Sequence, residues 1–175
     1  MVRPPLAAYP IRVAPLLFFD IETTGLRPDR GAQITEVAVV DHTAVRYDWK
    51  RSREATPLAD ALVALIGHLE RGIVVGHNLA FDFRFVAYEA DRLGLPGPRL
   101  QYIDTLGLAR RLLDRTANFQ LGTLLTHLDQ PPEAALHTAL GDAQATRALF
   151  WALIDHGGLD TLADAGMRRL DWASF

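Results

Sequence analysis

A short apolar run that ends in two acidic residues constrains this chain more than any other feature. Residues 16–26 read LLFFDIETTGL, and the run is typical of a buried strand that ends at Asp20 and Glu22. Side chains two residues apart on a strand point to the same face of the sheet. Carboxylates a few Å apart oppose each other's ionisation, so the pair is costly unless a cation or a shared proton relieves it. The sequence therefore predicts a strand over 16–21 with a charged site at its end.

Length and composition bound the class of protein. The chain has 175 residues, of which 49% are hydrophobic, and this suits one domain with a sizeable core. No run of about 18 apolar residues predicts a membrane span, and the proline-rich N-terminus does not resemble a signal peptide. The absence of cysteine excludes disulfides and thiolate metal sites. We therefore expect a cytoplasmic protein with no membrane partner.

The net charge of −3 argues against a protein that grips long duplexes through its general field. Local basic patches remain compatible with it. Of the 18 basic residues only Lys50 is a lysine, and arginine is the better bidentate partner for phosphate.

Hydrophobic periodicity predicts three strands followed by alternating helices and strands. Strands are expected over 16–21, 31–41, 44–49 and 73–75, with a fifth that ends at Asp104. Helices are expected from a cap at Thr56, with Pro57 at the first helical position, to Gly72, then up to Gly94, over 105–114 and 119–129, and from about Ala139. This order predicts an α/β fold with a five-stranded mixed sheet flanked by helices.

Three segments make up the expected domain organisation. Residues 1–15 hold four prolines and are expected to form a loose N-terminal arm, and residues 16–156 form the domain. Residues 157–175 carry a weak helical pattern and are expected to be a C-terminal extension, either packed or mobile.

Two more acids and a histidine are expected at the same edge of the sheet. The carboxyl ends of strands in an open α/β sheet converge on a crevice in which ligands bind. The fourth strand runs out through His77 and Asn78 to Asp82, in the first turn of a helix. His137 precedes the last helix, and Asp142 lies in its first turns. Three acidic segments and one histidine are thus predicted to meet.

Carboxylates without cysteine or clustered histidines form a hard, oxygen-rich site, which suits Mg²⁺ or Mn²⁺ better than zinc. Two such ions, roughly 3.5–4 Å apart, clamp the attacking and leaving oxygens of a phosphoryl displacement. His137 can accept a proton from water near neutral pH. Taken singly, Asp82 and Asp142 are equally well explained as acids favoured by a helix dipole, and His137 as a loop histidine. Their combination in order favours catalysis.

The motifs also carry a family resemblance. FDIETTGL, GHNLAFD and HTALGDA, with IDTLGLARRLL before the third, resemble in order the motifs of the DEDDh (DnaQ-like) 3′-5′ exonucleases. That family includes the proofreading epsilon subunit of bacterial DNA polymerase III, RNase T and oligoribonuclease. The likeness extends over about Leu16 to Ile154 and implies an RNase H-like fold. At the matching positions it implies four metal-binding acids and a general base: Asp20, Glu22, Asp82 and Asp142, with His137 as the base.

The resemblance also implies residues that bind substrate. The backbone around Thr23 and Thr24 is expected to hold the terminal nucleotide, Leu26 to wedge against its base, and Asn78 and Phe81 to line the pocket. A wedge and an aromatic wall suit a terminal base that must leave its stack, since stacking on a side chain contributes about 1–3 kcal/mol per base.

The expected function is metal-dependent hydrolysis at 3′ ends of single-stranded or frayed DNA, which releases nucleoside 5′-monophosphates with two Mg²⁺ or Mn²⁺ ions as cofactors. A polymerase or repair protein is an expected partner. The chain departs from the family at Thr138 and Gly141, where charged or larger residues are common, and it lacks an HGIT-like stretch and a long polymerase-binding extension. Two alternatives stay open, namely an exoribonuclease like oligoribonuclease or RNase T, and a non-catalytic module that binds nucleic acid.

Other polar residues have ordinary explanations. Asp104 is expected to be an N-cap, or else to support the site from behind. Glu36 is expected on a solvated strand face. The remaining histidines lack metal-like spacing, and the arginines after Asp104 fit a solvated helix face better than a phosphate site: His42, His68, His127 and His156; Arg110, Arg111 and Arg115.

Overall fold

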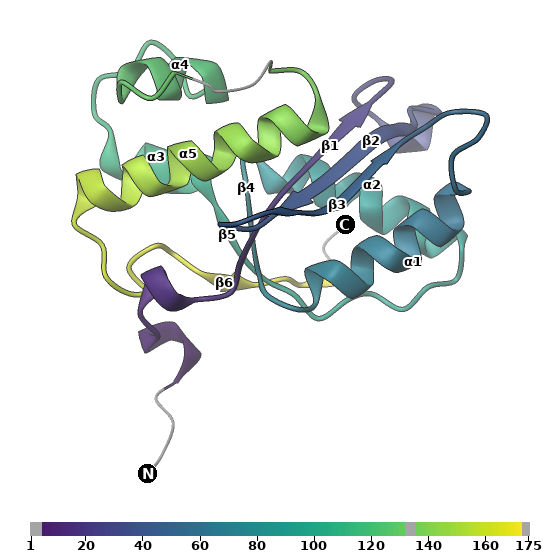
Figure 1. The fold of residues 1–175 in the computed structure, drawn as a ribbon, viewed down its shortest axis with the longest axis horizontal. Coiled ribbons are helices and arrows are strands. Elements are labelled where there is room, and N and C mark those ends of the chain that lie inside the picture. Colours follow the sequence, from purple (N-terminus) through teal and green to yellow (C-terminus); the bar gives the residue numbers. More distant parts are fainter. Residues whose placement is uncertain (1–4, 132–135, 173–175) are drawn as a thin grey trace.

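One mixed β-sheet separates two groups of helices in the computed structural model, which describes residues 5–131 and 136–172 (Figure 1). The strand order is β3-β2-β1-β4-β5-β6. Strands β1, β2 and β3 pair antiparallel, β4 runs parallel to β1 and β5, and β6 is antiparallel to β5. The strands are β1 Leu16–Thr23, β2 Ile34–Val40, β3 Val45–Lys50, β4 Ile73–Gly76, β5 Gln101–Asp104 and β6 Arg168–Arg169.

The predicted mixed sheet flanked by helices is confirmed, but the described part of the chain forms six strands rather than five. The additional strand, β6, comes from the C-terminal segment, where a helix pattern was expected. Its two residues pair with Gln101 and Tyr102 at the edge of the sheet. A strand this short has no periodicity, so the pattern of its own residues could not reveal it.

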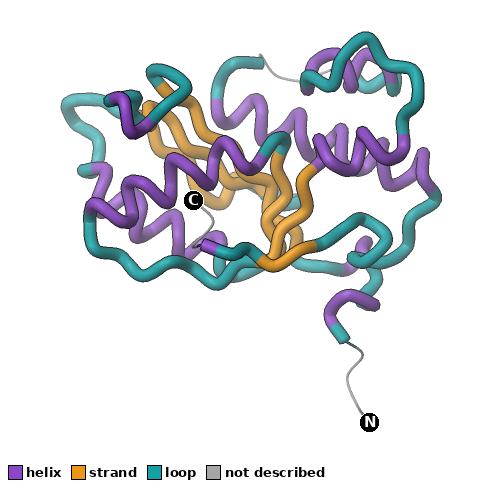
Figure 2. The backbone as a smooth tube through the Cα atoms, turned by 180° about the vertical axis from the view of Figure 1, so that it is seen from behind, coloured by secondary structure: helices purple, strands orange, loops and turns teal. Residues whose placement is uncertain are grey.

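The helices cover both faces of the sheet (Figures 1 and 2). On one face α3, α4 and α5 pack against strand side chains such as Phe18 and Ala38. On the other, α1 and α2 pack against the alternate side chains, such as Phe19 and Val37. The helices are α1 Leu58–Leu69, α2 Leu79–Arg92, α3 Thr105–Leu112, α4 Leu121–His127 and α5 Ala139–Gly157, and short 3₁₀ turns lie at Leu6–Ala8, Ile11–Val13 and Pro28–Arg30.

The helix starts differ from one another in how they are capped. Asp104 caps α3 by accepting from the backbone N–H of Leu106, as the sequence predicts. The expected cap at Thr56 is wrong, because α1 begins after Pro57 without a side-chain cap. The carbonyl of Thr56 instead accepts from the indole N–H of Trp49.

The two terminal segments pair with each other. Ile11 is fully buried, and its backbone N–H donates to the Asp160 carbonyl at 2.9 Å. The N–H of Leu162 donates to the Tyr9 carbonyl, and the isolated bridge from Pro10 to Thr161 lies between these two bonds. The expectation of a loose arm is therefore wrong for this part of the N-terminal segment. The limits of the domain at residues 16 and 156 stay a prediction.

The parallel pairing of β1 with β4 ends early and opens the site. It runs from Leu16 to Phe18 on β1, while β1 continues to Thr23 beside β2 alone. The far end of β1 therefore has an unpaired edge, and α2 starts beside it. This is the place at which the strand order reverses direction, where open α/β sheets bind ligands.

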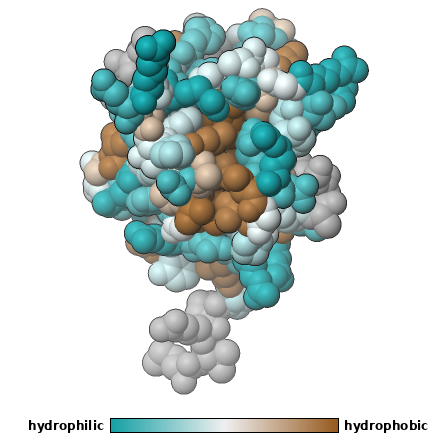
Figure 3. All heavy atoms as spheres, turned by 90° about the vertical axis from the view of Figure 1, so that its right-hand side faces the viewer, coloured by the Kyte–Doolittle hydropathy of each residue, from teal (hydrophilic) through white to brown (hydrophobic). Residues whose placement is uncertain are grey.

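The surface carries an apolar area. A brown apolar area bordered by hydrophilic side chains lies on the face at the right of Figure 1, where α1 is found (Figure 3). Within residues 5–131 and 136–172, no helix is long and apolar enough to cross a membrane.

Candidate active site

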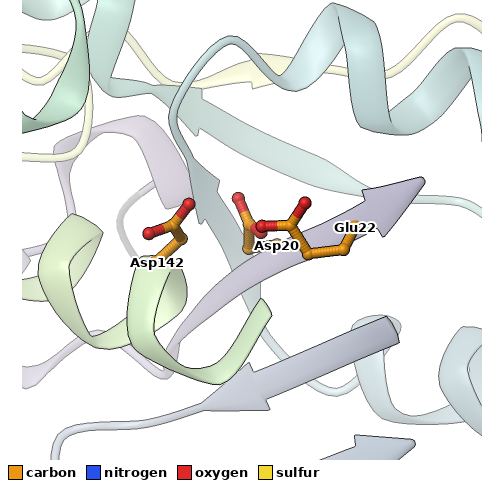
Figure 4. Close-up of side chains that lie close together, drawn as sticks. All are labelled: Asp20, Glu22 and Asp142. Atoms are coloured by element: carbon orange, nitrogen blue, oxygen red, sulfur yellow. The ribbon is translucent and has the colours of Figure 1, made fainter. Parts of the chain in front are cut away.

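Three carboxylates from two distant parts of the chain point toward one another (Figure 4). Asp20 and Glu22 come from β1, and Asp142 comes from the first turn of α5. One carboxylate oxygen of each lies within 4.8 Å of those of the other two. The packing of α5 explains this, because Phe150 further along that helix contacts Phe18 on the same face of β1, with ring centroids 5.6 Å apart. The helix therefore runs along the strand and delivers its acidic end to the two acids.

Asp82 approaches β1 from the side of α2. Its Oδ1 accepts from the backbone N–H of Ile21 at 3.2 Å, on the strand edge that β4 leaves open. Asp82 is only 4% exposed, and its charge acts on that of Asp20. The structure thus brings together all four acids that the sequence singled out, with three in reach of one shared ion and Asp82 directly beside them.

Burial and mutual repulsion make these acids hard to ionise. Burial raises the pKa of Asp20 well above its usual range, and the charges of Asp82, Asp142 and Glu22 raise it further. Burial likewise raises the pKa of Asp82 well above its usual range. The pKa of Glu22 is raised as well, mainly by burial and next by the charge of Asp142. Removing this repulsion requires either protons or added positive charge.

His137 stands directly before α5, with its backbone in the left-handed region at φ 71°. Its backbone N–H donates to Asp142 Oδ1 at 3.2 Å, so this turn and the carboxylate hold each other. The side chain is exposed, and its positive charge lowers the pKa of both Glu22 and Asp142, against the larger effect of their burial. Thr138 then caps the helix, since its hydroxyl oxygen accepts from the N–H of Gly141 at 3.1 Å.

Glu36 on β2 is a residue whose place the sequence analysis missed. It does not lie on a solvated face: it is the strand partner of Glu22, and its side chain is 17% exposed. One oxygen forms an ion pair with Lys50, and Oε2 accepts from the backbone N–H of Ala139 at 3.3 Å. The sequence signal that could have found it is the hairpin register, which sets Glu36 opposite Glu22.

His77 and Asp104 connect neighbouring segments through hydrogen bonds. The two ring nitrogens of His77 lie 2.9 Å from the Thr105 hydroxyl and 2.9 Å from the Phe119 carbonyl, so one side chain joins three segments. Asp104, besides capping α3, accepts from the backbone N–H of Asn78 at 3.0 Å. The expected cap at Asp104 is therefore confirmed and its support of the site stays a prediction, while His77 has a bonding role that the sequence did not indicate.

The residues expected to bind substrate lie at the end of β1, in the loop after it, or at the start of α2. Leu26 is 76% exposed, and the Thr24 hydroxyl accepts from the N–H of Gln33 at 2.9 Å, which folds the loop back on itself. Asn78 takes a left-handed backbone at φ 67° before α2, and the ring of Phe81 lies 5.1 Å from that of Phe85. Thr23 is engaged in the same loop, where its hydroxyl donates to the Gly25 carbonyl at 2.7 Å. Their contact with a nucleotide stays a prediction.

Comparison with known proteins shows the family to which the chain belongs. A family model described as RNase_T exonuclease matches residues 50–150. The chain belongs to this exonuclease family. The match covers Asp82, His137 and Asp142 and begins after Asp20 and Glu22.

Individual relatives of this exonuclease chain extend the comparison. A DNA polymerase III PolC-type of Thermotoga petrophila is 30% identical over 166 residues, which cover 81% of this chain and 12% of the relative. The 3′-5′ exonuclease DinG of Bacillus subtilis is 24% identical over 164 residues, covering 78% of this chain and 17% of that protein. The chain thus spans less than a fifth of the length of these two curated relatives.

A solved structure confirms the fold. Exonuclease X in complex with 5′ overhanging duplex DNA aligns with a TM-score of 0.57 and 25% identity, covering 86% of this chain and 99% of that one. The RNase H-like exonuclease fold that the sequence motifs imply is therefore confirmed.

Proposed function

We propose that this exonuclease domain removes nucleotides from 3′ ends of single-stranded or frayed DNA and releases nucleoside 5′-monophosphates. The observation that carries the proposal is the meeting of Asp20, Glu22 and Asp142 within 4.8 Å on a chain of the exonuclease family. The relatives named DinG 3′-5′ exonuclease and PolC-type DNA polymerase III support the direction of attack and a DNA substrate.

The chemistry of the donors fits divalent cations. All four acids offer carboxylate oxygens, which Mg²⁺ and Mn²⁺ prefer, and close like charges need positive charge to be stable. Asp20, Glu22 and Asp142 would hold one ion, and Asp82 with Asp20 would hold a second. When bound, the ions supply the Lewis acidity that polarises the scissile phosphodiester and stabilises its developing charge.

The proposed role of His137 is that of general base. Its exposed imidazole is near enough to Glu22 and Asp142 to lower the pKa of each carboxyl. It forms no part of the three-carboxylate group. A ring nitrogen there can accept the proton of the attacking water as the phosphodiester bond is cleaved. The bond from its backbone N–H to Asp142 fixes the start of the loop that carries it.

Exposed Leu26 and half-buried Phe81 are proposed to hold the terminal nucleotide. Leu26 projects from the loop after β1, and Phe81 lies one position before Asp82 on α2. A base that leaves its stack can insert against these two side chains, and stacking on a side chain recovers about 1–3 kcal/mol. Asn78 is held at the same helix start by Asp104.

The test is a gel of one 3′-terminal sequence, prepared as 5′-labelled DNA and RNA, with Mg²⁺, Mn²⁺ or chelator. We expect metal-dependent laddering from the 3′ end and 5′-monophosphate products, with a loss of about 10³-fold or more for Asp20→Asn. Asp48→Asn is the matched control. Asp48 is exposed on β3 and is the register partner of Ala38 on β2, which in turn is the register partner of Asp20 on β1. Full metal-dependent cleavage by Asp20→Asn would overturn the proposal.

The same experiment separates the alternatives. Faster cleavage of RNA than of DNA would favour an exoribonuclease, and binding without cleavage would favour a non-catalytic module. A polymerase or repair partner and a cytoplasmic location stay predictions of the sequence.

A further inference from the structure

A row of three charged side chains crosses the sheet beside the acidic site. Glu22 on β1 is the register partner of Glu36 on β2, and Glu36 is the register partner of Lys50 on β3. Directly paired residues in an antiparallel sheet point to the same face, so all three face α5. The row places a second glutamate and the only lysine of the chain next to a proposed metal ligand.

Both carboxylate oxygens of Glu36 have partners. Oε1 forms an ion pair with Lys50, and Oε2 accepts from the backbone N–H of Ala139 at 3.3 Å. Ala139 is the first residue of α5, and the first N–H groups of a helix have no partner within the helix. Glu36 therefore supplies a cap from a strand 103 positions earlier in the chain, and the helix dipole favours its negative charge there.

This contact lies in the turn of α5 that carries Asp142. Asp142 follows Ala139 by three positions, in the same first turn of α5, and must face Asp20 and Glu22 on β1. Glu36 belongs to the strand paired with β1, so its bond links the helix start to the sheet beside those acids. The group able to share one ion in the described chain consists of Asp20, Glu22 and Asp142, and Glu36 lies outside it.

We propose that Glu36 is a positioning residue: its acceptor oxygen fixes the start of α5, and with it Asp142, over Asp20 and Glu22, while Lys50 offsets the negative charge that the carboxylate brings next to Glu22. The bond to Ala139 needs an acceptor oxygen at this point of β2. An ionised carboxylate is the strongest such acceptor, but it adds a negative charge next to Glu22. Lys50, which is 71% exposed at its side chain, offsets that charge without entering the site. The inference rests on the proposed metal-dependent function.

The hydrogen bond and the charge can be separated by two substitutions. Glu36→Gln keeps an oxygen that can accept from Ala139 and removes the charge, whereas Glu36→Ala removes both. Asp48→Asn is the control, since it removes one negative charge from the same face of β3, two positions from Lys50.

Three readouts decide the matter: calorimetric Mn²⁺ affinity, hydrogen exchange of peptides from the start of α5 (residues 136–150) and from the strands of the sheet, and kcat with KM on single-stranded DNA. For Glu36→Ala we expect faster exchange confined to the first turn of α5, Mn²⁺ affinity and kcat lower by about 10–100-fold, and KM changed by less than about threefold. Glu36→Gln should restore most of each value, and Asp48→Asn should match the wild type.

Equal losses in Glu36→Gln and Glu36→Ala would overturn the inference, because charge alone would then be responsible. It would also be overturned if Glu36→Ala exchanged faster over the whole sheet while binding Mn²⁺ as the wild type does, since the role would then be general stability. Failure of the proposed function looks different: a wild type without nuclease activity leaves the exchange and Mn²⁺ measurements to decide on Glu36.

Discussion

Two poorly exposed aspartates of the β1–β2 pair, Asp41 and Asp20, experience opposite surroundings. Asp41 follows β2, beside the start of β1, and is 8% exposed. Its Oδ1 accepts from the N–H of Thr43 at 2.7 Å, the Thr43 hydroxyl at 2.9 Å and the N–H of Ala44 at 2.8 Å, and its Oδ2 from Arg46. Asp20, on β1 opposite Ala38, faces the carboxylates of Glu22 and Asp142 instead.

The pKa shifts of the two residues record the difference. Burial alone would raise the pKa of Asp41, but the backbone and hydroxyl donors and Arg46 together hold it well below its usual range. Burial raises the pKa of Asp20, and the neighbouring acids add to the rise. The comparison teaches that burial does not by itself mark a functional acid. Asp41 has donors around it within the chain, whereas Asp20 faces other acids, whose repulsion protons or cations would relieve.

The largest effect on stability is expected where the acid is already satisfied. Asp41→Ala removes an acceptor from three donors and leaves Arg46 without its carboxylate partner, which should lower the free energy of unfolding by about 2–4 kcal/mol. Each kcal/mol corresponds to roughly 2–4 °C in Tm for a chain of this size. Thermal and urea unfolding measure the loss. His42→Ala, in the same turn but exposed, is the control and should change Tm little. An unchanged Tm in Asp41→Ala would remove the contrast.

The second effect is stabilisation of the unsatisfied acids by cations. Mg²⁺ or Mn²⁺ at about 100 times the dissociation constant should stabilise the fold by about 2.7 kcal/mol, as expected for a ligand that binds only the folded state. Asp41→Ala should gain as much as the wild type, because Asp41 is not part of the three-carboxylate group, whereas Asp20→Asn should lose most of the gain. Scanning calorimetry with and without chelator tests this. A gain that survives in Asp20→Asn would place the ions elsewhere.

The third effect is a pH dependence of opposite sign at the two sites, measured without metal. The folded-state pKa of Asp20 is raised, so its stabilising contribution is present below the ordinary carboxyl pKa of about 4 and is lost as pH rises through the raised value. Asp20→Asn should therefore become progressively more stable than the wild type between about pH 4 and neutrality. The pKa of Asp41 is lowered, so its contribution is present above about pH 4 and is lost as pH falls. The penalty of Asp41→Ala should shrink at acidic pH. Differences with the same sign at both sites would contradict the comparison.

The sequence predicts the local parts of this molecule well. The first five strands, the start of the last helix at Ala139 and the cap at Asp104 follow from patterns within a few neighbouring residues. The gathering of Asp20, Asp82 and Asp142 could also be foreseen, because strand ends and helix starts in an α/β sheet converge on one edge. Such signals are carried by residue type and spacing, which a sequence shows directly.

The parts that the sequence did not predict depend on partners far along the chain. Strand β6 exists because two residues of the C-terminal segment meet the free edge of β5, and the N-terminal segment is ordered by bonds to Asp160 and Leu162. Glu36 looked solvated because its contacts come from β3 and α5. Thr56 has the residue type of a cap, but its side chain accepts no hydrogen bond from the start of α1. In each case tertiary contacts outweighed a local preference.

The smallest expected effect concerns a buried polar group that has neither the donors that surround Asp41 nor the like charges that surround Asp20. Thr146 lies on α5 one turn after Asp142 and is fully buried, and no partner for its hydroxyl is found among the described residues. Thr105 is its matched counterpart, equally buried, but its hydroxyl donates to the Gly76 carbonyl at 3.1 Å and contacts His77. A hydroxyl without a partner costs free energy when it is buried, whereas a bonded one contributes to stability.

Replacement of each threonine by valine tests this last contrast with the same small change of shape. Thr146→Val should raise the free energy of unfolding by about 0.5–1 kcal/mol, because it removes an unsatisfied hydroxyl and keeps a β-branched side chain of similar helix preference. Thr105→Val should lower it by about 1–2 kcal/mol, because it leaves His77 and the Gly76 carbonyl without that hydroxyl. Urea unfolding of both variants measures the difference. A loss of stability in Thr146→Val would mean that its hydroxyl has a partner in solution, such as a buried water beneath Asp142, and that this side chain is satisfied in the way Asp41 is.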